Sequence, residues 1–232
     1  MTRVTVLIAT FDEEENIEAC VRRVAAVELG DREILVVDGG HDRTGEIVRA
    51  LSRALPVRYV RNEGDRGKGH AIRTGCAEAA GEVIAQIDAD LQFLPEELPR
   101  LIAPILAGRA DVVLGSRFAR TSVRRPGSTP LLRTLGNKLA SGYASILFGH
   151  RMTDVQAGMK AWSRRAMERL GPLTSDDYAY EVEIPARALR AGLRVIDVPI
   201  TTDARAAGET KVNVVLDGIP LLASISRFRL GR

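Results

Sequence analysis

Short apolar runs alternate with longer amphipathic stretches through the first half of the chain. The runs are rich in β-branched residues and predict buried strands, and the stretches between them carry apolar residues at helical spacing. The predicted strands are 4–9, 34–37, 57–60, 83–87 and 112–114, and the predicted helices are 13–27, 44–55, 68–80 and 95–106. This alternation indicates an α/β fold, with a mostly parallel central sheet and helices on both faces.

The second half is less regular. Residues 117–130 contain two prolines, a glycine and several arginines, which predicts a long loop. Further helices are predicted at 131–148, 163–170 and 180–191, a strand at 194–198, and a polar, mobile segment at 201–211.

The tail carries apolar residues along one helical side and arginines at its end. These apolar residues are Val215, Ile219, Leu222, Ile225 and Phe228. Two interpretations stay open: a helix packed on its own domain, or an interfacial helix that lies on lipid. Gly218 and Pro220 argue against a long straight helix. We therefore divide the chain into a main domain, 1–211, and an amphipathic tail, 212–232.

Composition adds limits on partners and location. The 232 residues are 45% apolar and 27% charged, which is ordinary for a globular protein that needs no disulfides. The net charge is only +3, and clustered arginines suit an anionic small molecule or membrane surface better than nucleic acid. Residues 1–3 lead directly into a strand, and no run of about 18 apolar residues occurs. We expect a cytoplasmic protein, with peripheral contact at the cytoplasmic face of a membrane as the alternative location.

Polar residues follow the predicted strands at 10–12, 38–40, 88–90 and 115–117. Ligands of parallel sheets bind at the carboxyl ends of the strands, so these ends mark the candidate site. Asp88 and Asp90, with Gln92 close behind, offer the oxygen ligands that Mg²⁺ or Mn²⁺ prefers. The alternative is a solvated turn, which would be the better interpretation of an isolated pair of aspartates.

Two other segments suggest nucleotide contacts. Asp38 is placed to accept hydrogen bonds from a base or a ribose hydroxyl, although a turn or capping aspartate explains it too. The glycine-rich segment 64–69 contains Lys68 but lacks the Ser or Thr of a phosphate-binding loop, so we interpret it as a flexible entry to the next helix.

The order of motifs resembles the family-2 glycosyltransferases, and among them the polyprenyl-phosphate (dolichol-phosphate) mannosyltransferases and glucosyltransferases. The similar segments are Ala9-Thr10-Phe11-Asp12-Glu13-Glu14-Glu15-Asn16-Ile17, Val36-Val37-Asp38, Asp88-Ala89-Asp90-Leu91-Gln92, Gly115-Ser116-Arg117, Thr153-Asp154-Val155-Gln156-Ala157-Gly158 and Arg205-Ala206-Ala207-Gly208-Glu209-Thr210-Lys211. The chain departs from the family pattern at Ala9, which replaces a proline, and in the segment 38–44, which is one residue shorter.

The resemblance implies a GT-A nucleotide-binding fold and metal-dependent transfer of a hexose, with inversion, from a nucleotide-diphosphate sugar of the GDP-mannose or UDP-glucose type. The implied metal ligands are Asp88, Asp90 and Gln92. The implied catalytic residues are Asp90, Arg117 and Glu183. The implied substrate-binding residues are Thr10, Phe11, Asp12, Glu13, Asp38, Lys68, Asp88, Ala89, Ser116, Asp154, Arg205 and Lys211.

The acceptor decides whether a catalytic base is needed. A lipid monophosphate, with a second pKa of about 6, is already nucleophilic near neutral pH, whereas a hydroxyl acceptor needs a carboxylate base. Asp154, Glu181 and Glu183 are the candidate carboxylates, but none lies in an unambiguous base motif. The sequence thus favours a polyprenyl or dolichyl phosphate acceptor. The alternatives are a soluble hydroxyl acceptor, a sugar-nucleotide pyrophosphorylase, and a binding module without catalysis.

Overall fold

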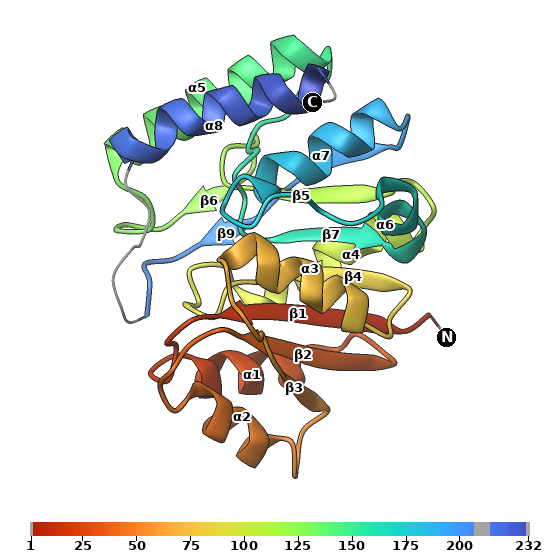
Figure 1. The fold of residues 1–232 in the computed structure, drawn as a ribbon, viewed down its shortest axis with the longest axis vertical. Helices are drawn as coiled ribbons and strands as arrows, with labels where there is room; N and C mark the ends of the chain where they lie inside the picture. The colour runs from red at the N-terminus through yellow and green to blue at the C-terminus, as the bar shows by residue number, and fades with distance from the viewer. Residues whose placement is uncertain (1, 207–213, 231–232) are drawn as a thin grey trace.

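The computed structural model describes residues 2–206 and 214–230, with the backbone alone for 214–219. A seven-stranded sheet crosses the centre of the molecule, and helices cover both of its faces (Figure 1). The strand order is β3-β2-β1-β4-β7-β5-β8. All neighbouring strands are parallel except at β7, which runs antiparallel to both β4 and β5. The mostly parallel, doubly covered sheet predicted from the sequence is confirmed.

The first half alternates strands and helices as predicted. Its elements are β1 (Val4–Thr10), α1 (Ile17–Ala26), β2 (Arg32–Asp38), α2 (Thr44–Leu51), β3 (Val57–Arg61), α3 (Lys68–Glu78), β4 (Val83–Gln86), the 3₁₀ turn η1 (Pro95–Glu97), α4 (Leu98–Leu106) and β5 (Val112–Ser116). The largest differences are that α1 begins later and α2 ends earlier than predicted. Before α1, Glu13 O accepts from the amides of Asn16 and Ile17 and closes a turn.

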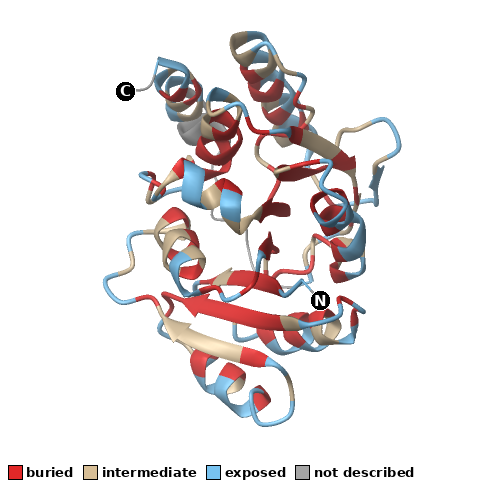
Figure 2. Cartoon of the chain, turned by 90° about the vertical axis from the view of Figure 1, so that its right-hand side faces the viewer, coloured by how far each residue is buried: buried red, intermediate tan, exposed pale blue. Residues whose placement is uncertain are grey.

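Successive strand residues point to opposite faces of the sheet and fill two separate cores. One core packs the sheet against α1, α2 and α4, and the other packs it against α3 and the helices of the second half. The inner strands β1, β2, β4 and β5 are therefore buried almost along their whole length, the edge strands β3 and β8 are partly exposed, and the helices expose one side (Figure 2).

The second half contains two features that the sequence did not predict. Its elements are β6 (Val123–Arg124), α5 (Leu131–Phe148), β7 (Lys160–Ser163), α6 (Arg164–Leu170), α7 (Tyr180–Arg190), β8 (Val195–Pro199), β9 (Thr201–Thr202) and α8 (Val214–Leu230). β7 reads Lys-Ala-Trp-Ser and lacks the apolar run that marks a buried strand. β6 lies inside the segment predicted as one long loop, and it pairs with β9, which lies in the segment predicted to be mobile.

The tail forms one helix, α8, which continues through Pro220. Helices α5 and α8 lie side by side, with α7 beneath them (Figure 1). Ile225 and Phe228 are buried in the same core as α7, and Tyr143 and Ser226 share a hydrogen bond of 2.7 Å between α5 and α8. This packing fits a helix folded on its own domain. Within the described ranges, no helix combines the length and apolarity that crossing a bilayer requires.

Candidate active site

The carboxyl ends of β1, β4 and β5 open into a cavity of about 770 Å³. Its remaining walls come from the start of α3, the loop before α7, and the helices α5 and α8. Most residues that the sequence assigned to the site line this cavity: Thr10, Phe11, Glu13, Lys68, Asp88, Ala89, Asp90, Gln92, Arg117 and Arg205. The sheet thus brings together segments that lie almost 200 residues apart in the chain.

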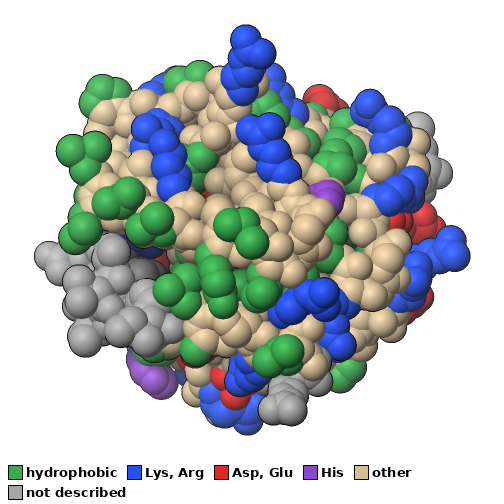
Figure 3. Space-filling view, turned by 90° about the horizontal axis from the view of Figure 1, so that it is seen from above, with side chains coloured by type: hydrophobic (Ala, Val, Ile, Leu, Met, Phe, Trp, Pro, Cys, Tyr) green, Lys and Arg blue, Asp and Glu red, His purple; other side chains and the backbone are tan. Residues whose placement is uncertain are grey.

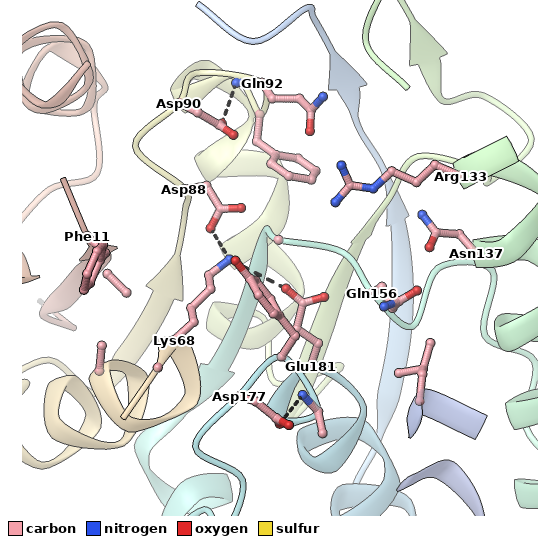
Figure 4. A pocket seen from close by; sticks show the side chains of 18 of the residues that line it. Phe11, Lys68, Asp88, Asp90, Gln92, Arg133, Asn137, Gln156, Asp177 and Glu181 are labelled. Atoms are coloured by element: carbon pink, nitrogen blue, oxygen red, sulfur yellow. Dashed lines mark hydrogen bonds and ion pairs between the residues drawn. The ribbon is translucent and has the colours of Figure 1, made fainter. Parts of the chain in front are cut away.

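The acidic loop after β4 places two carboxylates at the cavity floor. Lys68 Nζ lies 2.7 Å from Asp88 Oδ1, and Arg205 Nη2 lies 3.0 Å from Asp90 Oδ2 (Figure 4 shows the first pair). Burial and the neighbouring charge of Asp88 raise the pKa of Asp90, although Arg205 opposes this effect. Each carboxylate therefore has a cation beside it that lowers the cost of its partial burial.

The donor set of this loop fits a hard divalent cation. Such ions take carboxylate and amide oxygens and commonly complete their coordination with substrate phosphates and water. Asp88 and Asp90 both attract cationic groups in the structure, and Gln92 follows on the same loop. Among the described residues no cluster of three or more His, Cys, Asp and Glu side chains forms. Asp88, Asp90 and Gln92 would supply part of the coordination of such an ion, and substrate phosphates and water would supply the rest.

Lys68 lies at the start of α3, where the chain on both sides of it approaches the loop before α7 closely. A Cβ at Gly69 would lie 2.2 Å from Ser175 O, so only glycine allows this contact. Lys68 Nζ also lies 3.6 Å from Glu181 Oε1. Burial lowers the pKa of Lys68, but the charges of Asp88 and Glu181 outweigh that effect and raise it well above its usual value. Lys68 is therefore a permanent cation between two carboxylates.

Arg117 forms a buried ion pair at the end of β5. Its backbone N and its Nε donate to Asp154 Oδ2 at 3.1 and 2.7 Å, and its Nη2 donates to Asp154 Oδ1 at 2.9 Å. The arginine is 4% exposed and the aspartate is fully buried. Asp154 thus lies behind the cavity wall, where it orients Arg117 instead of meeting a substrate. Ser116 has a similar supporting place, since its hydroxyl accepts from the amides of Phe118 and Ala119 at 3.0 Å.

Three consecutive carbonyl groups beside the acidic loop are each held by a buried side chain. The pairs are Arg117 Nη2 with Gln156 O (2.9 Å), Lys160 Nζ with Ala157 O, and Gln86 Nε2 with Gly158 O (3.1 Å). Burial lowers the pKa of Lys160, which is fully buried. A Cβ at Gly158 would lie 2.3 Å from Asp88 Oδ2. The three hydrogen bonds therefore hold the loop 156–158, called the clamped loop below, directly against the acidic pair.

Asp38 and Asp12 lie outside the cavity lining and join the ends of β1 and β2. Asp38 accepts from Thr10 Oγ1 at 3.0 Å and from Tyr59 OH at 3.2 Å. Asp12 adopts a left-handed backbone (φ 55°) and accepts from the amide of His41 at 2.7 Å. The segment 38–44, shorter by one residue than the family pattern, is therefore held against the end of β1.

The structure separates the two glutamates at the start of α7. Glu183 is fully buried away from the cavity and accepts from the amides of Thr174 and Ser175, each at 2.8 Å. This position does not fit the catalytic role predicted for Glu183. Glu181 lines the cavity instead, because residues two apart on a helix point in nearly opposite directions. Lys211, predicted to bind substrate, lies outside the described residues.

The wall opposite the acidic pair includes residues that the sequence did not single out. Arg133 and Asn137 reach in from α5, and Gln156 from the clamped loop (Figure 4). Burial and the charge of Arg117 lower the pKa of Arg133. Beyond these polar groups the wall becomes apolar, with Leu139 of α5 and Leu221 of α8. The one sequence feature that pointed to these residues was the cluster of arginines between 117 and 133.

Comparison with known proteins yields one matching family model, Glycosyl transferase family 2, over residues 5–171. The chain is 32% identical over 222 residues to the polyprenol monophosphomannose synthase of Mycolicibacterium smegmatis, covering 91% of this chain and 81% of that protein. It is 30% identical over 212 residues to the dolichol-phosphate mannosyltransferase of Pyrococcus furiosus, covering 90% of this chain and 59% of that protein.

Among solved structures, glucosyl-3-phosphoglycerate synthase from Mycobacterium tuberculosis, crystallised with Mn²⁺, UDP and glucosyl-3-phosphoglycerate, resembles the fold. The TM-score is 0.75 at 22% identity, over 99% of this chain and 80% of that one. Identity at this level supports the fold alone, and the α/β architecture expected from the motif order is confirmed by it.

Proposed function

Because the chain belongs to glycosyl transferase family 2, we propose that it transfers a hexose from a nucleotide-diphosphate sugar to a polyprenyl or dolichyl phosphate, with inversion at the anomeric carbon. One observation carries the proposal. A single cavity runs from an acidic pair, past two arginines, to an apolar wall between α5 and α8. The relatives named as polyprenol and dolichol-phosphate mannosyltransferases support the same acceptor class.

The acidic loop is the donor end of the cavity. Asp88, Asp90 and Gln92 would hold Mg²⁺ or Mn²⁺, which neutralises the charge of the departing diphosphate. Gln92 Nε2 donates to Ser128 O, so its amide oxygen is the part left to face an ion. Lys68 and Arg205 lie within reach of the same phosphates, because both already contact the acidic pair. Thr10 and Phe11 then border the nucleoside.

The arginine wall is the acceptor end. Arg117 uses its Nε and Nη2 for Asp154 and for Gln156 O, which fixes its guanidinium group. Arg117 and Arg133 both line the cavity, so the two guanidinium groups can donate to one phosphate. A phosphate monoester that is largely dianionic near neutral pH attacks without losing a proton. The bond between its oxygen and the anomeric carbon forms on the side opposite the departing diphosphate, which leaves with the electron pair of the broken C–O bond.

A soluble hydroxyl acceptor is the second candidate. Glu181 favours it, because this carboxylate lines the cavity and could accept the proton of a hydroxyl group. Its ion pair with Lys68 weakens that case, because the carboxylate already has an ammonium group as its partner. The pyrophosphorylase alternative does not fit the family to which the chain belongs.

The proposal can be tested by direct transfer. Purified protein is incubated with GDP-mannose or UDP-glucose and undecaprenyl phosphate in detergent, and the glycolipid is measured by mass spectrometry. We expect product with Mn²⁺ or Mg²⁺, none with chelator, and at least about a hundredfold loss for Asp90→Ala. Asp111→Asn is the control, because Asp111 precedes the amino end of β5, whereas the cavity lies at the carboxyl end of this strand. Transfer to small polyols but never to lipid phosphates would overturn the acceptor assignment.

A further inference from the structure

Helix α5 has its apolar and polar sides reversed. Small or polar side chains face the protein: Thr134, Asn137, Ala140, Ser141 and Ala144. Large apolar side chains face outward: Leu131, Leu132, Leu135, Leu139 and Ile146. We call this second set the leucine face of α5. Its two ends are the most exposed, at 87% for Leu131 and 84% for Ile146.

A helix on the surface of a water-soluble domain normally buries its large apolar residues. Helix α4 follows this rule, since its leucines and isoleucines at 98, 101, 102 and 105 are buried. The leucine face of α5 runs over about four turns, roughly 22 Å, and forms a contiguous apolar strip rather than isolated exposed residues. Such a strip indicates a surface that is covered when the protein works.

The surroundings of the leucine face are basic. Between Asp111 and Asp154 the chain has seven Lys and Arg residues and no Asp or Glu. The exposed members of this set are Arg120, Arg124, Arg125, Lys138 and Arg151. Seen from above, the face carries apolar side chains with Lys and Arg among them, and acidic side chains lie mainly at its periphery (Figure 3). An apolar strip bordered by cations complements the headgroups and acyl chains of an anionic membrane.

The leucine face is also continuous with the cavity. Leu139 belongs to both, being 64% exposed and part of the cavity wall. Leu222 of α8 also lines the cavity and is 41% exposed at the surface. A ligand whose phosphate lies near Arg133 would therefore pass its hydrocarbon tail between these leucines and leave the protein at the leucine face.

We propose that the leucine face of α5 is the surface by which the protein docks on an anionic lipid bilayer, with α5 parallel to the membrane plane and the cavity mouth open to the lipid. This inference rests on the proposed function for the lipid nature of the acceptor. The sequence suggested the tail as a helix that lies on lipid. We assign membrane contact to α5 instead, because Ile225 and Phe228 of α8 are buried in the protein core.

Vesicle flotation tests the proposal. Wild-type protein should float with phosphatidylcholine vesicles that contain 30% phosphatidylglycerol, and less with pure phosphatidylcholine. Leu131→Ser/Leu135→Ser/Ile146→Ser, which changes no residue of the cavity wall, should reduce the bound fraction by at least about tenfold. Single variants provide a matched comparison: Leu135→Ser should weaken binding and Leu106→Ser should not, since the two leucines are 56% and 51% exposed but only one lies on α5.

A second measurement separates docking from catalysis. Transfer to water-soluble geranyl phosphate should be unchanged in the triple variant, while transfer to undecaprenyl phosphate in vesicles should fall. If the wild-type protein transfers to no lipid phosphate yet binds vesicles through the leucine face, the proposed function fails and the docking surface stands. Equal flotation of wild type and triple variant would overturn the docking surface. So would a wild-type dimer in sedimentation velocity that the triple variant converts to a monomer.

Discussion

Removing the charge of Asp154 should cost far more stability than removing the charge of Asp111. Both aspartates accept from the backbone N, Nε and Nη2 of one arginine: Asp154 from Arg117 at 3.1, 2.7 and 2.9 Å, and Asp111 from Arg194 at 2.8, 3.0 and 3.0 Å. The pairs thus have the same hydrogen-bond pattern. They differ in burial, since the side chains are 4% and 0% exposed in the first pair and 55% and 22% in the second.

Asp154→Asn leaves the Arg117 guanidinium buried without a counter-charge. Breaking a buried pair from one side costs about 3–5 kcal/mol, which for a chain of this size lowers the unfolding midpoint by roughly 10 °C. Asp111→Asn should leave the midpoint close to the wild-type value, because water and salt screen an exposed pair.

The assay is thermal unfolding at pH 7.5 in low and high salt for both variants and the wild type. Added salt should reduce the small effect at Asp111 and leave the large effect at Asp154 unchanged. Arg117→Met/Asp154→Leu should recover most of the lost stability, since apolar residues of similar volume replace a buried pair without loss. The same double variant should stay inactive if Arg117 binds the acceptor phosphate. Equal midpoint shifts for the two single variants would refute the reasoning.

Three further predictions concern the cavity and its support. Glu183→Gln should lower stability without changing substrate KM. Burial raises the pKa of Glu183, but hydrogen bonds from the loop before α7 outweigh this effect and lower the pKa. The stabilisation by the Glu183 carboxylate is therefore complete above about pH 4.5 and is lost as pH falls through the pKa of the folded state. Urea unfolding of wild type and variant at several pH values should show the difference in their stability disappearing in acid. Lys160→Met removes the hydrogen bond to the carbonyl of Ala157 and should reduce kcat by about tenfold with little change in donor affinity. Initial-rate kinetics would measure kcat, and thermal shifts with nucleotide would measure the affinity for the donor. Lys68→Met should bind Mn²⁺ more tightly in the absence of nucleotide, as measured by calorimetry, because the ammonium beside Asp88 no longer competes.

Much of the fold could be predicted because its parallel strands are continuous apolar runs. β1 and β2 are buried on both faces, so nearly every residue of each strand is apolar and the strand is visible in the sequence as an unbroken apolar run. The acidic pair was predictable for a related reason, since it follows directly from such a strand. β7 was not predictable, because it begins with a charged residue, Lys160, which is buried only when β4 and Tyr180 of α7 are in place beside it.

The choice between Glu181 and Glu183 also lay beyond the sequence. The pattern of α7 predicted a helix, but the carboxylate that faces the cavity depends on how the helix is rotated about its axis against the sheet. That rotation is fixed by distant contacts, such as the hydrogen bond between Gln86 and Tyr180 at 2.7 Å. The reversed sides of α5 were hidden for the same reason: periodicity predicts a helix, and it does not say which side faces the core.

The position of β7 has a consequence for synthesis of the chain. β4 lies between β1, which the ribosome makes earlier, and β7, which emerges more than 70 residues later. Until Lys160–Ser163 appears, the nascent sheet presents β4 as an open, apolar edge with unpaired amides and carbonyls. A chain truncated after β5 should therefore be prone to aggregate, and the enzyme's first half depends on its second half for protection as well as for chemistry.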